Sequence, residues 1–324
     1  MINASLLKNL IREPIWADSV GEVCLAVDFS EANYSSDEVI AISSWLQRQP
    51  VPVIGLMNDN EQILEALDFV ADTELEVELL ASFIGQHRQA SAVLVQVTRV
   101  TMGLPVIAAL TVESLGYATL QGSEEFSHWL SRQNKTNVGG LNNSSPVLME
   151  RTGTELSILL NSPSNRNALS VSMRDGLSEA FSLVAMDNSI ENVVVSAAGS
   201  CFSAGGDLTE FGVSKDVAEA HRIRQLKMPA QYLAEHPGRY SFKLHGACIG
   251  AGIELPAFAG HISASRDTFF RLPEVAMGLI PGAGGCVSIP RRIGRHRTNY
   301  LAVTGMKLSV ENALSWGLID EITN

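Results

Sequence analysis

The sequence lacks the features that mark secreted, membrane-spanning and metal-binding proteins. Its four cysteines lie far apart among 324 residues, without a Cys-x-x-Cys pair, so neither a disulfide framework nor a tetrahedral zinc site is expected. No apolar run approaches the roughly 20 residues of a membrane-spanning helix, and the N-terminal segment lacks the cleavage site of a signal peptide. We therefore expect a cytoplasmic protein with no membrane partner and no bound metal.

Positive charge is also scarce, and it is unevenly distributed. Residues 1–150 contain 19 acidic and 7 basic side chains, whereas residues 151–324 contain 16 of each, so the whole net charge of −12 belongs to the first part. Without an extended basic surface that could neutralise phosphates, no nucleic-acid partner is expected. The unequal charge indicates two regions with different surfaces.

The pattern of apolar residues changes at a polar segment rich in Asn, Gly and Ser, residues 134–146, which is typical of a linker. Before it, runs with strand or helix spacing occupy residues 23–29, 36–46, 51–57, 74–100 and 106–130. After it, apolar runs of strand length, such as 155–160 and 192–197, alternate with helical spacing. The sequence thus predicts an α/β protein whose strands end in glycine-rich turns, where proteins of this class bind ligands.

The first of these turns runs from Cys201 to Asp207 and contains two glycines. Asp207 is expected to cap a helix that begins there, which leaves the amides of Ala204 and Gly205 pointing at a ligand oxygen. The alternative is a tight strand-to-helix turn that binds nothing.

The second turn, from Gly246 to Glu254, opens an apolar helix whose free N–H groups suit an oxygen that becomes negative during a reaction. Glu254 lies among apolar neighbours, where a carboxylate is costly to bury unless it is paired or its raised pKa makes it useful as an acid or base. The alternative is a first-turn glutamate that points to solvent.

The third turn combines Phe270–Glu274 with a glycine cluster at residues 278–285. Pro273 fixes the approach of a second carboxylate, Glu274, after an aromatic strand. Neither glycine cluster has the spacing of a dinucleotide-binding loop, and no Gly-Lys-Ser or Gly-Lys-Thr occurs, so nucleotide-binding motifs are excluded.

Taken together and in order, these segments resemble the crotonase superfamily, the enoyl-CoA hydratases and isomerases. The matching segments between Val147 and Ile322 are NSPSNRNALS, FSAGGDLTEF, HGACIGAGIELP, FRLPEVAMGLIPGAGG, PRRIG, VTGMKLS and ALSWGLIDEI. The resemblance implies a spiral of ββα turns, assembly as a homotrimer or dimer of trimers, and an oxyanion hole that stabilises a thioester enolate. It also implies an acyl-CoA substrate, with coenzyme A as part of that substrate and no permanently bound cofactor.

The resemblance also assigns roles to residues. The oxyanion-hole amides would come from Ala204 and Ala251, while Glu254 would activate water and Glu274 would deliver a proton to the α-carbon. Contacts with the CoA moiety and substrate are expected at Asn165, Arg166, Asn167, Ala168, Gly205, Gly206, Asp207, Leu208, Gly250, Pro281 and Gly282. Two glutamates favour hydration, because isomerases of the superfamily can work with the carboxylate at the position of Glu274 alone. Thioester hydrolysis would use the same oxyanion hole, and a catalytically silent subunit that binds CoA esters or acts as a scaffold would also fit the resemblance.

The order of the segments departs from that family, because its helical C-terminal tail has no counterpart after Ile322. Residues 74–133 resemble that tail, and residues 20–57 resemble a remnant of another core copy. We therefore expect a rearranged crotonase, with a remnant and tail-like segment in residues 1–133, the linker at 134–146 and the catalytic core at 147–324. The alternative for the first part is an unrelated helical domain.

A group of basic side chains in the second half has three possible roles. They could meet CoA phosphates, contact the acidic N-terminal part or form a solvated helix face. The group comprises Arg291, Arg292, Arg295 and Arg297.

Overall fold

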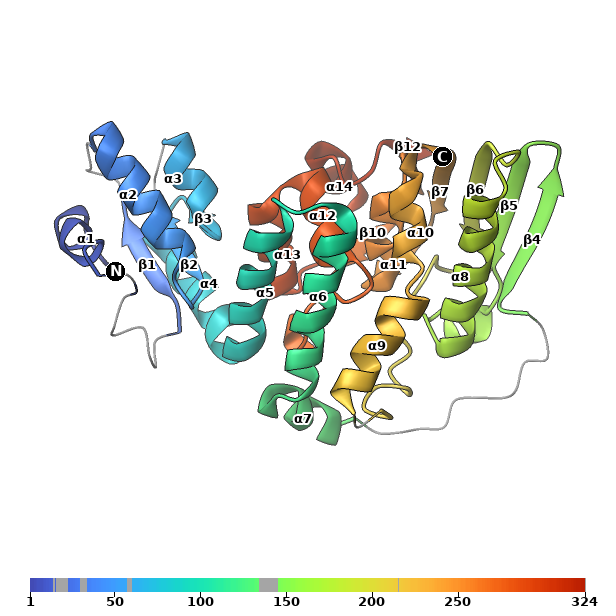
Figure 1. Cartoon of the computed structure of the whole chain (residues 1–324), viewed down its shortest axis with the longest axis horizontal. Helices are drawn as coiled ribbons and strands as arrows, with labels where there is room; N and C mark the ends of the chain where they lie inside the picture. Colours follow the sequence, from blue (N-terminus) through green and yellow to red (C-terminus); the bar gives the residue numbers. More distant parts are fainter. Residues whose placement is uncertain are drawn as a thin grey trace.

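A computed structural model of the protein describes residues 1–13, 15, 23–29, 34–56, 60–133, 145–214 and 216–323. Along the chain it forms an N-terminal lobe, a layer of helices and a C-terminal core (Figure 1). All but the last two residues of the predicted linker, 134–146, lie outside the described part of the chain.

A six-stranded sheet in the order β12-β9-β7-β6-β5-β4 carries the core, and its neighbouring strands are parallel except for β4 and β5. Its strands are β4 (Val147–Thr152), β5 (Glu155–Leu160), β6 (Asn192–Ala197), β7 (Tyr240–Leu244), β9 (His261–Ser265) and β12 (Glu321–Thr323). A smaller sheet contains β8 (Ala247–Ile249), β10 (Phe269–Arg271) and β11 (Leu308–Ser309). The core helices are α8 (Val171–Met186), α9 (Val217–Lys227), α10 (Ala230–Glu235), α11 (Ala251–Glu254), α12 (Gly285–Ile293), α13 (Arg295–Thr304) and α14 (Val310–Trp316).

The chain repeatedly passes from the large sheet to the small sheet and then into a helix, as in β7–β8–α11 and again in β9–β10–α12. This confirms the α/β class and the ββα spiral. Because each helix begins directly after a strand of the small sheet or its following loop, the glycine-rich turns gather on one side of the core.

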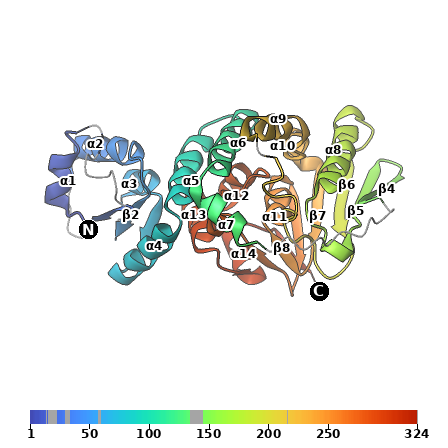
Figure 2. The same cartoon turned by 90° about the horizontal axis from the view of Figure 1, so that it is seen from below.

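Long helices from the N-terminal half cover this core. They are α4 (Glu74–Gln86), α5 (Arg88–Thr101), α6 (Val106–Gln121) and α7 (Glu124–Ser131). Helices α5 and α6 pack on α12, α5 also packs on α13, and α6 packs on α9 and α10 (Figures 1 and 2). The helical region supplied from the N-terminal part is thus part of the same hydrophobic core as the sheet.

Each of the two long helical runs predicted in this region is divided into two helices. His87, with φ −140° and ψ 65°, separates α4 from α5. Ser123 separates α6 from α7, because its Oγ accepts a hydrogen bond from the Phe126 amide at 3.1 Å and so caps the next helix. The break at His87 involves no side-chain cap, whereas the one at Ser123 comes from a capping hydrogen bond, and neither is visible in the apolar period.

The N-terminal lobe has a parallel sheet in the order β1-β2-β3 and a small core of its own, which includes the buried side chains of Ile42 and Trp45. Its elements are α1 (Ala4–Leu10), β1 (Leu25–Asp28), α2 (Ser36–Gln47), β2 (Val53–Leu56), α3 (Glu61–Ala66) and β3 (Phe69–Ala71). The predicted strand, helix and strand of residues 23–57 are present as β1, α2 and β2. Their proposed origin as a second core copy stays a prediction.

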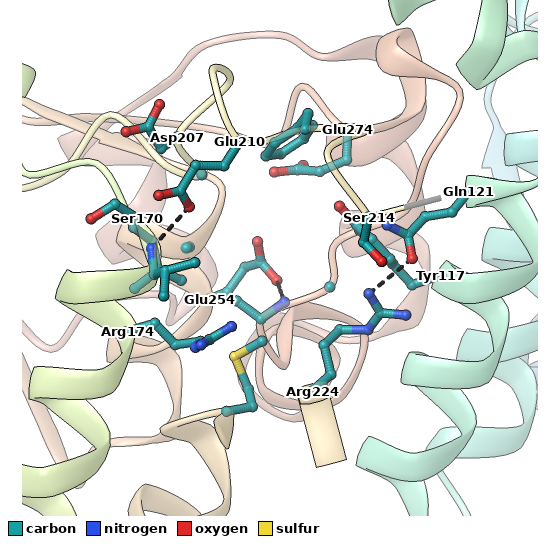
Figure 3. A pocket seen from close by; sticks show the side chains of 18 of the residues that line it. Tyr117, Gln121, Ser170, Arg174, Asp207, Glu210, Ser214, Arg224, Glu254 and Glu274 are labelled. Atoms are coloured by element: carbon teal, nitrogen blue, oxygen red, sulfur yellow. Dashed lines mark hydrogen bonds between the residues drawn. The ribbon is translucent and has the colours of Figure 1, made fainter. Parts of the chain in front are cut away.

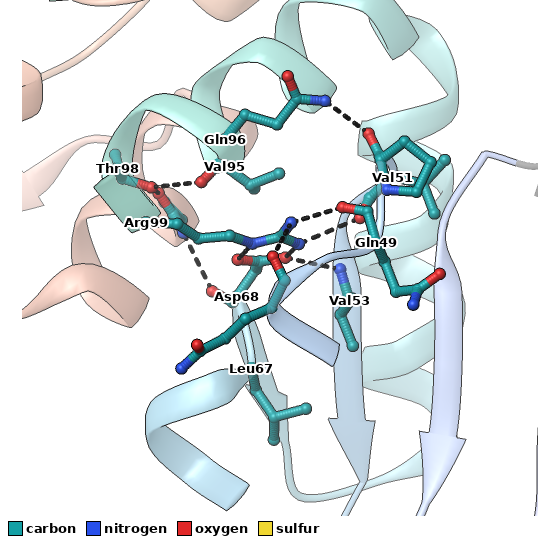
Figure 4. Close-up of polar contacts among 12 residues, drawn as sticks. Gln49, Val51, Val53, Leu67, Asp68, Val95, Gln96, Thr98 and Arg99 are labelled. Atoms are coloured by element: carbon teal, nitrogen blue, oxygen red, sulfur yellow. Dashed lines mark hydrogen bonds and ion pairs between the residues drawn. The ribbon is translucent and has the colours of Figure 1, made fainter. Parts of the chain in front are cut away.

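Asp68 connects the lobe to the helical layer (Figure 4) and also to the core. Its side chain is fully buried, and its Oδ2 accepts a hydrogen bond from the Val53 amide at 2.8 Å. Its Oδ1 accepts hydrogen bonds from Nε of Arg99 on α5 at 2.9 Å and from Nη1 of Arg295 on α13 at 2.5 Å. One carboxylate therefore pairs with two largely buried cations at the junction of lobe, helical layer and core.

We predict that Asp68→Ala lowers the free energy of unfolding by about 3–5 kcal/mol, the usual cost of removing one partner of a buried ion pair. Urea unfolding followed by circular dichroism measures the change. Asp72→Ala removes an exposed carboxylate four residues later and is expected to change stability by less than about 0.5 kcal/mol. Equal unfolding midpoints for the two variants would contradict this role of Asp68.

Candidate active site

A pocket of about 240 Å³ opens between the glycine-rich turns of the core and the helices α6 and α9 (Figure 3). Six of the residues predicted from the sequence line it, namely Gly206, Asp207, Ala251, Glu254, Glu274 and Gly282. Turns that are far apart in the sequence therefore meet at one cavity.

Glu254 ends the four-residue helix α11, and only 2% of its surface is exposed. This burial excludes the alternative in which it points to solvent. Its Oε2 accepts hydrogen bonds from the amides of Ala283 at 2.7 Å and Gly285 at 3.0 Å. Burial raises the pKa of Glu254 to about 7, and these backbone N–H groups limit the increase because they stabilise the ionised form.

Glu274 follows β10, and its side chain lines the pocket together with that of Glu254 (Figure 3). A Cβ atom at position 250 would lie 2.3 Å from Oε1 of Glu274 and 3.6 Å from Oε1 of Glu254, so only glycine allows this arrangement. Within the described residues, the buried Oε2 of Glu274 has no hydrogen-bond partner. Burial, and next the negative charge of Glu254, raise the pKa of Glu274 well above its usual range.

A third buried carboxylate, Glu113 on α6, was not predicted. Its Oε1 accepts a hydrogen bond from the Gly284 amide at 2.7 Å, and its Oε2 accepts one from the Cys286 amide at 2.8 Å. Burial, followed by the charge of Glu254, raises the pKa of Glu113 well above its usual range. The available signal was a single acid within VIAALTVESLGYATLQ, the same criterion that singled out Glu254.

The structure corrects the assignment of Ala204. Its amide donates a hydrogen bond to the carbonyl oxygen of Arg166 at 3.0 Å, and Ala204 does not line the pocket. The Gly205 amide is used as well, since it donates to Oγ of Ser203 at 3.2 Å. By contrast, Gly206 and Ala251 line the pocket, and neither of their amides donates a hydrogen bond within the described part of the chain.

Asp207 does not cap a helix, contrary to the prediction. Its Oδ1 accepts hydrogen bonds from the Thr209 amide at 3.0 Å and from Oγ1 of Thr209 at 2.7 Å, which closes a turn. The next helix, α9, begins only at Val217 and is capped by Asp216. An Asx turn therefore replaced the predicted helix start.

The segment predicted to lie near coenzyme A, residues 165–168, forms a tight loop outside the pocket lining. Arg166 and Asn167 adopt φ values of 57° and 52°, and the buried Asn167 side chain holds the loop. Its Nδ2 donates to the carbonyl oxygens of Ala198 at 2.8 Å and Cys201 at 3.2 Å. Asn167 thus stabilises the loop through its own hydrogen bonds. The Arg166 side chain is exposed.

The other residues predicted to contact substrate do not line the pocket. Leu208 is exposed, Gly205 and Gly250 have positive φ, and Pro281 is buried beside Gly282. Ala168 and Asn165 belong to the loop described above. The buried Oδ1 of Asn165 has no hydrogen-bond partner among the described residues.

The arginine group lies away from the pocket. Arg295 contacts Asp68, and Arg291 donates to the Leu104 carbonyl oxygen at 2.8 Å, so both reach the acidic N-terminal half. Arg292 pairs with Asp320, and Arg297 stacks over Trp316. Of the three roles left open for this group, contact with the N-terminal part is the one that the structure shows for Arg291 and Arg295.

Several pocket residues could not be recognised from the sequence, namely Tyr117, Gln121, Arg174, Glu210 and Arg224. Among the described residues, no cluster of His, Cys, Asp or Glu side chains is arranged to hold a metal ion. Likewise, none of the helices described is sufficiently long and apolar to span a bilayer.

Comparison with known proteins agrees with this geometry. The family model for enoyl-CoA hydratase/isomerase matches residues 150–324. The chain is 28% identical over 178 residues to 2,3-dehydroadipyl-CoA hydratase of Escherichia coli (strain K12), a match that covers 55% of this chain and 69% of that protein.

Solved structures of enoyl-CoA hydratases match a similar share of the chain. The hydratase from Thermoplasma volcanium GSS1 has 34% sequence identity and a TM-score of 0.51, over 57% of this chain and 74% of that one. The hydratase from Mycobacterium smegmatis has 30% identity and a TM-score of 0.51, over 56% and 70% of the two chains. With its family model matched across more than half of its length and its fold shared with these structures, the chain belongs to the enoyl-CoA hydratase/isomerase family.

Proposed function

We propose that the protein is an acyl-CoA enzyme that adds water to the double bond of a 2-enoyl-CoA thioester. The observation that carries this proposal is the buried pair Glu254 and Glu274, held side by side at a pocket with two free backbone amides. Coenzyme A enters as part of the substrate, with no permanently bound cofactor. Cytoplasmic location and assembly as a homotrimer or dimer of trimers belong to the same proposal.

The thioester oxygen becomes negative when a nucleophile adds to the conjugated double bond. We assign its two hydrogen-bond donors to the amides of Gly206 and Ala251, because both line the pocket and neither is used elsewhere in the described structure. Donors of this kind act where charge develops, and the loss of one typically costs about 10²–10³ in rate. Gly206 replaces Ala204 in this role.

The surroundings of the two glutamates support different protonation states. Neighbouring carboxylates do not ionise together easily, so one proton is shared between them. Two amides at the N-terminus of α12 stabilise the ionised form of Glu254. Glu274 has an unpaired oxygen and a negative neighbour, which favour its protonated form.

These states fit the addition of water. Glu254 takes a proton from water as the water oxygen bonds to the β-carbon, and electrons of the double bond move onto the thioester oxygen. Glu274 then gives its proton to the α-carbon, and the thioester carbonyl is restored. The proton gained by Glu254 replaces the one lost by Glu274, so one molecule of water has been added in total.

Glu113 is a positioning residue in this proposal. It shares the first turn of α12 with Glu254 and thereby fixes the backbone on which the Glu254 carboxylate rests. Because it comes from α6, the catalytic carboxylates depend on the helical layer as well as on the core.

We predict that Glu254→Gln and Glu274→Gln each reduce kcat for hydration by at least about 10²-fold, the usual contribution of a general acid or base. The decrease of absorbance of the conjugated enoyl thioester measures the rate. Glu179→Gln changes an exposed residue on α8 and serves as the control. Loss in Glu274→Gln alone, with shifted alkenes as products, would favour isomerisation, and unchanged rates in both variants would refute the site.

We predict a bell-shaped dependence of kcat/KM on pH, with the acidic limb near pH 7. Activity requires ionised Glu254, whose pKa is raised to about 7, so the rate falls as pH decreases through that value. It also requires protonated Glu274, so the rate falls again at higher pH. A profile that is flat between pH 5 and 8 would contradict the assignment.

We predict that Glu113→Gln lowers kcat at least about tenfold and the free energy of unfolding by about 1–3 kcal/mol, because an amide N–H₂ would face a backbone N–H donor. The acidic limb of the pH profile should move to higher pH, since Glu113 holds the turn whose amides at Ala283 and Gly285 lower the pKa of Glu254. Glu124→Gln, exposed on α7, is the control. A loss of stability without a shifted pH profile would reduce Glu113 to a structural role.

A further inference from the structure

We propose that Trp129 on α7 is a positioning residue for the Gly206 amide and acts through the ring of Phe211. The inference rests on the proposed acyl-CoA function and deepens it, because it names what holds one of the two donors to the thioester oxygen. It assigns a role in the reaction to a helix that precedes the linker.

The direction of the Gly206 N–H depends on the peptide plane that it shares with Gly205. The carbonyl oxygen of Gly205 accepts a hydrogen bond from the Leu169 amide at 2.7 Å, and the Leu169 carbonyl oxygen accepts one from the Asp207 amide at 3.4 Å. In a trans peptide the C=O and the following N–H point in opposite directions, so the Gly206 N–H points away from Leu169. A rotation of this plane would turn the N–H away from a ligand oxygen.

The ring of Phe211 packs directly on Gly206. A Cβ atom at position 206 would lie 2.9 Å from both Cε1 and Cζ of Phe211, so the ring is in close contact with the Gly206 α-carbon. That α-carbon and the N–H belong to one rigid peptide plane. The position of the Phe211 ring therefore helps to determine where the Gly206 N–H lies.

Helix α7 holds the Phe211 ring in place. Trp129 lies against Phe211 with ring centres 5.9 Å apart, and Phe126 is stacked on Trp129 with ring centres 5.9 Å apart and an angle of 16°. The next residue, Leu130, packs on Gly212, where a Cβ atom would lie 2.3 Å from Cδ2 of Leu130. Two consecutive residues of α7 thus contact two consecutive residues of the loop that follows Gly206.

The position of α7 is fixed in turn by the helical layer and the core. The carboxylate of Glu125 accepts hydrogen bonds from the amides of Gln89 at 2.7 Å and Ala90 at 3.1 Å, at the start of α5. Gly278 of the core packs on the α7 backbone, since a Cβ atom there would lie 2.5 Å from the Phe126 nitrogen. Helix α7 can therefore act as a fixed support for the loop.

Trp129 does not line the pocket, whereas Phe126 and Phe211 do. A substitution of Trp129 therefore removes the support of the Phe211 ring without removing a side chain from the pocket wall. This difference makes Trp129 the residue at which positioning can be separated from direct contact with substrate.

The test compares Trp129→Leu with Trp316→Leu, which changes a partly buried tryptophan on α14 that also packs on the hydrophobic core. We expect Trp129→Leu to lower kcat for hydration of but-2-enoyl-CoA by about tenfold, with KM changed less than about threefold, because a displaced oxyanion-hole donor acts mainly on the transition state. Trp129→Phe keeps an aromatic ring beside Phe211 and should retain at least about half of the wild-type kcat. Trp316→Leu should leave kcat within about twofold of the wild type.

Binding of a 3-oxoacyl-CoA thioester measures the oxyanion hole without catalysis. 3-Oxobutanoyl-CoA loses the proton between its two carbonyl groups to solvent, and the resulting enolate absorbs in the near ultraviolet, so the bound enolate can be titrated directly. We expect Trp129→Leu to weaken binding of this enolate by about tenfold and to leave the affinity for butanoyl-CoA within about twofold of the wild type.

Other results would overturn the inference. Unchanged enolate binding in Trp129→Leu would mean that the Gly206 amide does not depend on α7, and equal weakening of both thioesters would mean that Trp129 supports the pocket wall in general. The same losses in Trp316→Leu would show a general effect of lost packing. Absence of a bound enolate in the wild-type protein would refute the role of Gly206 itself.

The enolate titration also separates this inference from the proposed function. Weaker enolate binding in Trp129→Leu would support the inference even if the wild-type protein hydrated no enoyl-CoA, and the proposed reaction alone would then be wrong. Hydration by the wild-type protein with equal enolate binding in both proteins would refute the inference and leave the proposed function intact.

Discussion

The candidate active site depends on the first turn of the short helix α12. The amides of Ala283 and Gly285 hold Glu254, and those of Gly284 and Cys286 hold Glu113, so four successive N–H groups alternate between two buried carboxylates. A helix N-terminus tolerates this concentration of acid because its N–H groups are free and its dipole is positive there. Glu254 comes from the core and Glu113 from the helical layer, so neither half of the chain completes the site alone.

Two glycines of the motif at residues 278–285 allow close packing at the site. A Cβ atom at Gly285 would lie 2.6 Å from Cγ of Glu254, and one at Gly282 would lie 2.3 Å from the Tyr117 ring. Because Gly285 has no side chain, α12 can lie close to Glu254. Because Gly282 has none, α6 can approach the pocket.

The sequence identified site residues where a residue type conflicts with its local surroundings. A glutamate in an apolar segment identified Glu254, and strand runs ending in glycine predicted the turns that meet at the pocket. The sequence did not show which amide in a glycine-rich turn is free, because neighbouring N–H groups differ only in backbone direction. Ala204 was therefore predicted as the donor, whereas Gly206 lines the cavity. Arg224 could not be placed because its neighbours lie on a helix before the linker.

The shared turn of α12 also has a consequence for how the protein is made. Helices α5 and α6 leave the ribosome long before α12 and α13, so buried positions such as Leu94, Val95 and Ala109 have no partner surface during early synthesis. Contacts between residues far apart in sequence require closure of a long loop, which slows folding. The N-terminal lobe, with its own small core, can form first, whereas the carboxylates of Glu113, Glu254 and Glu274 reach their geometry only after the last third of the chain has emerged.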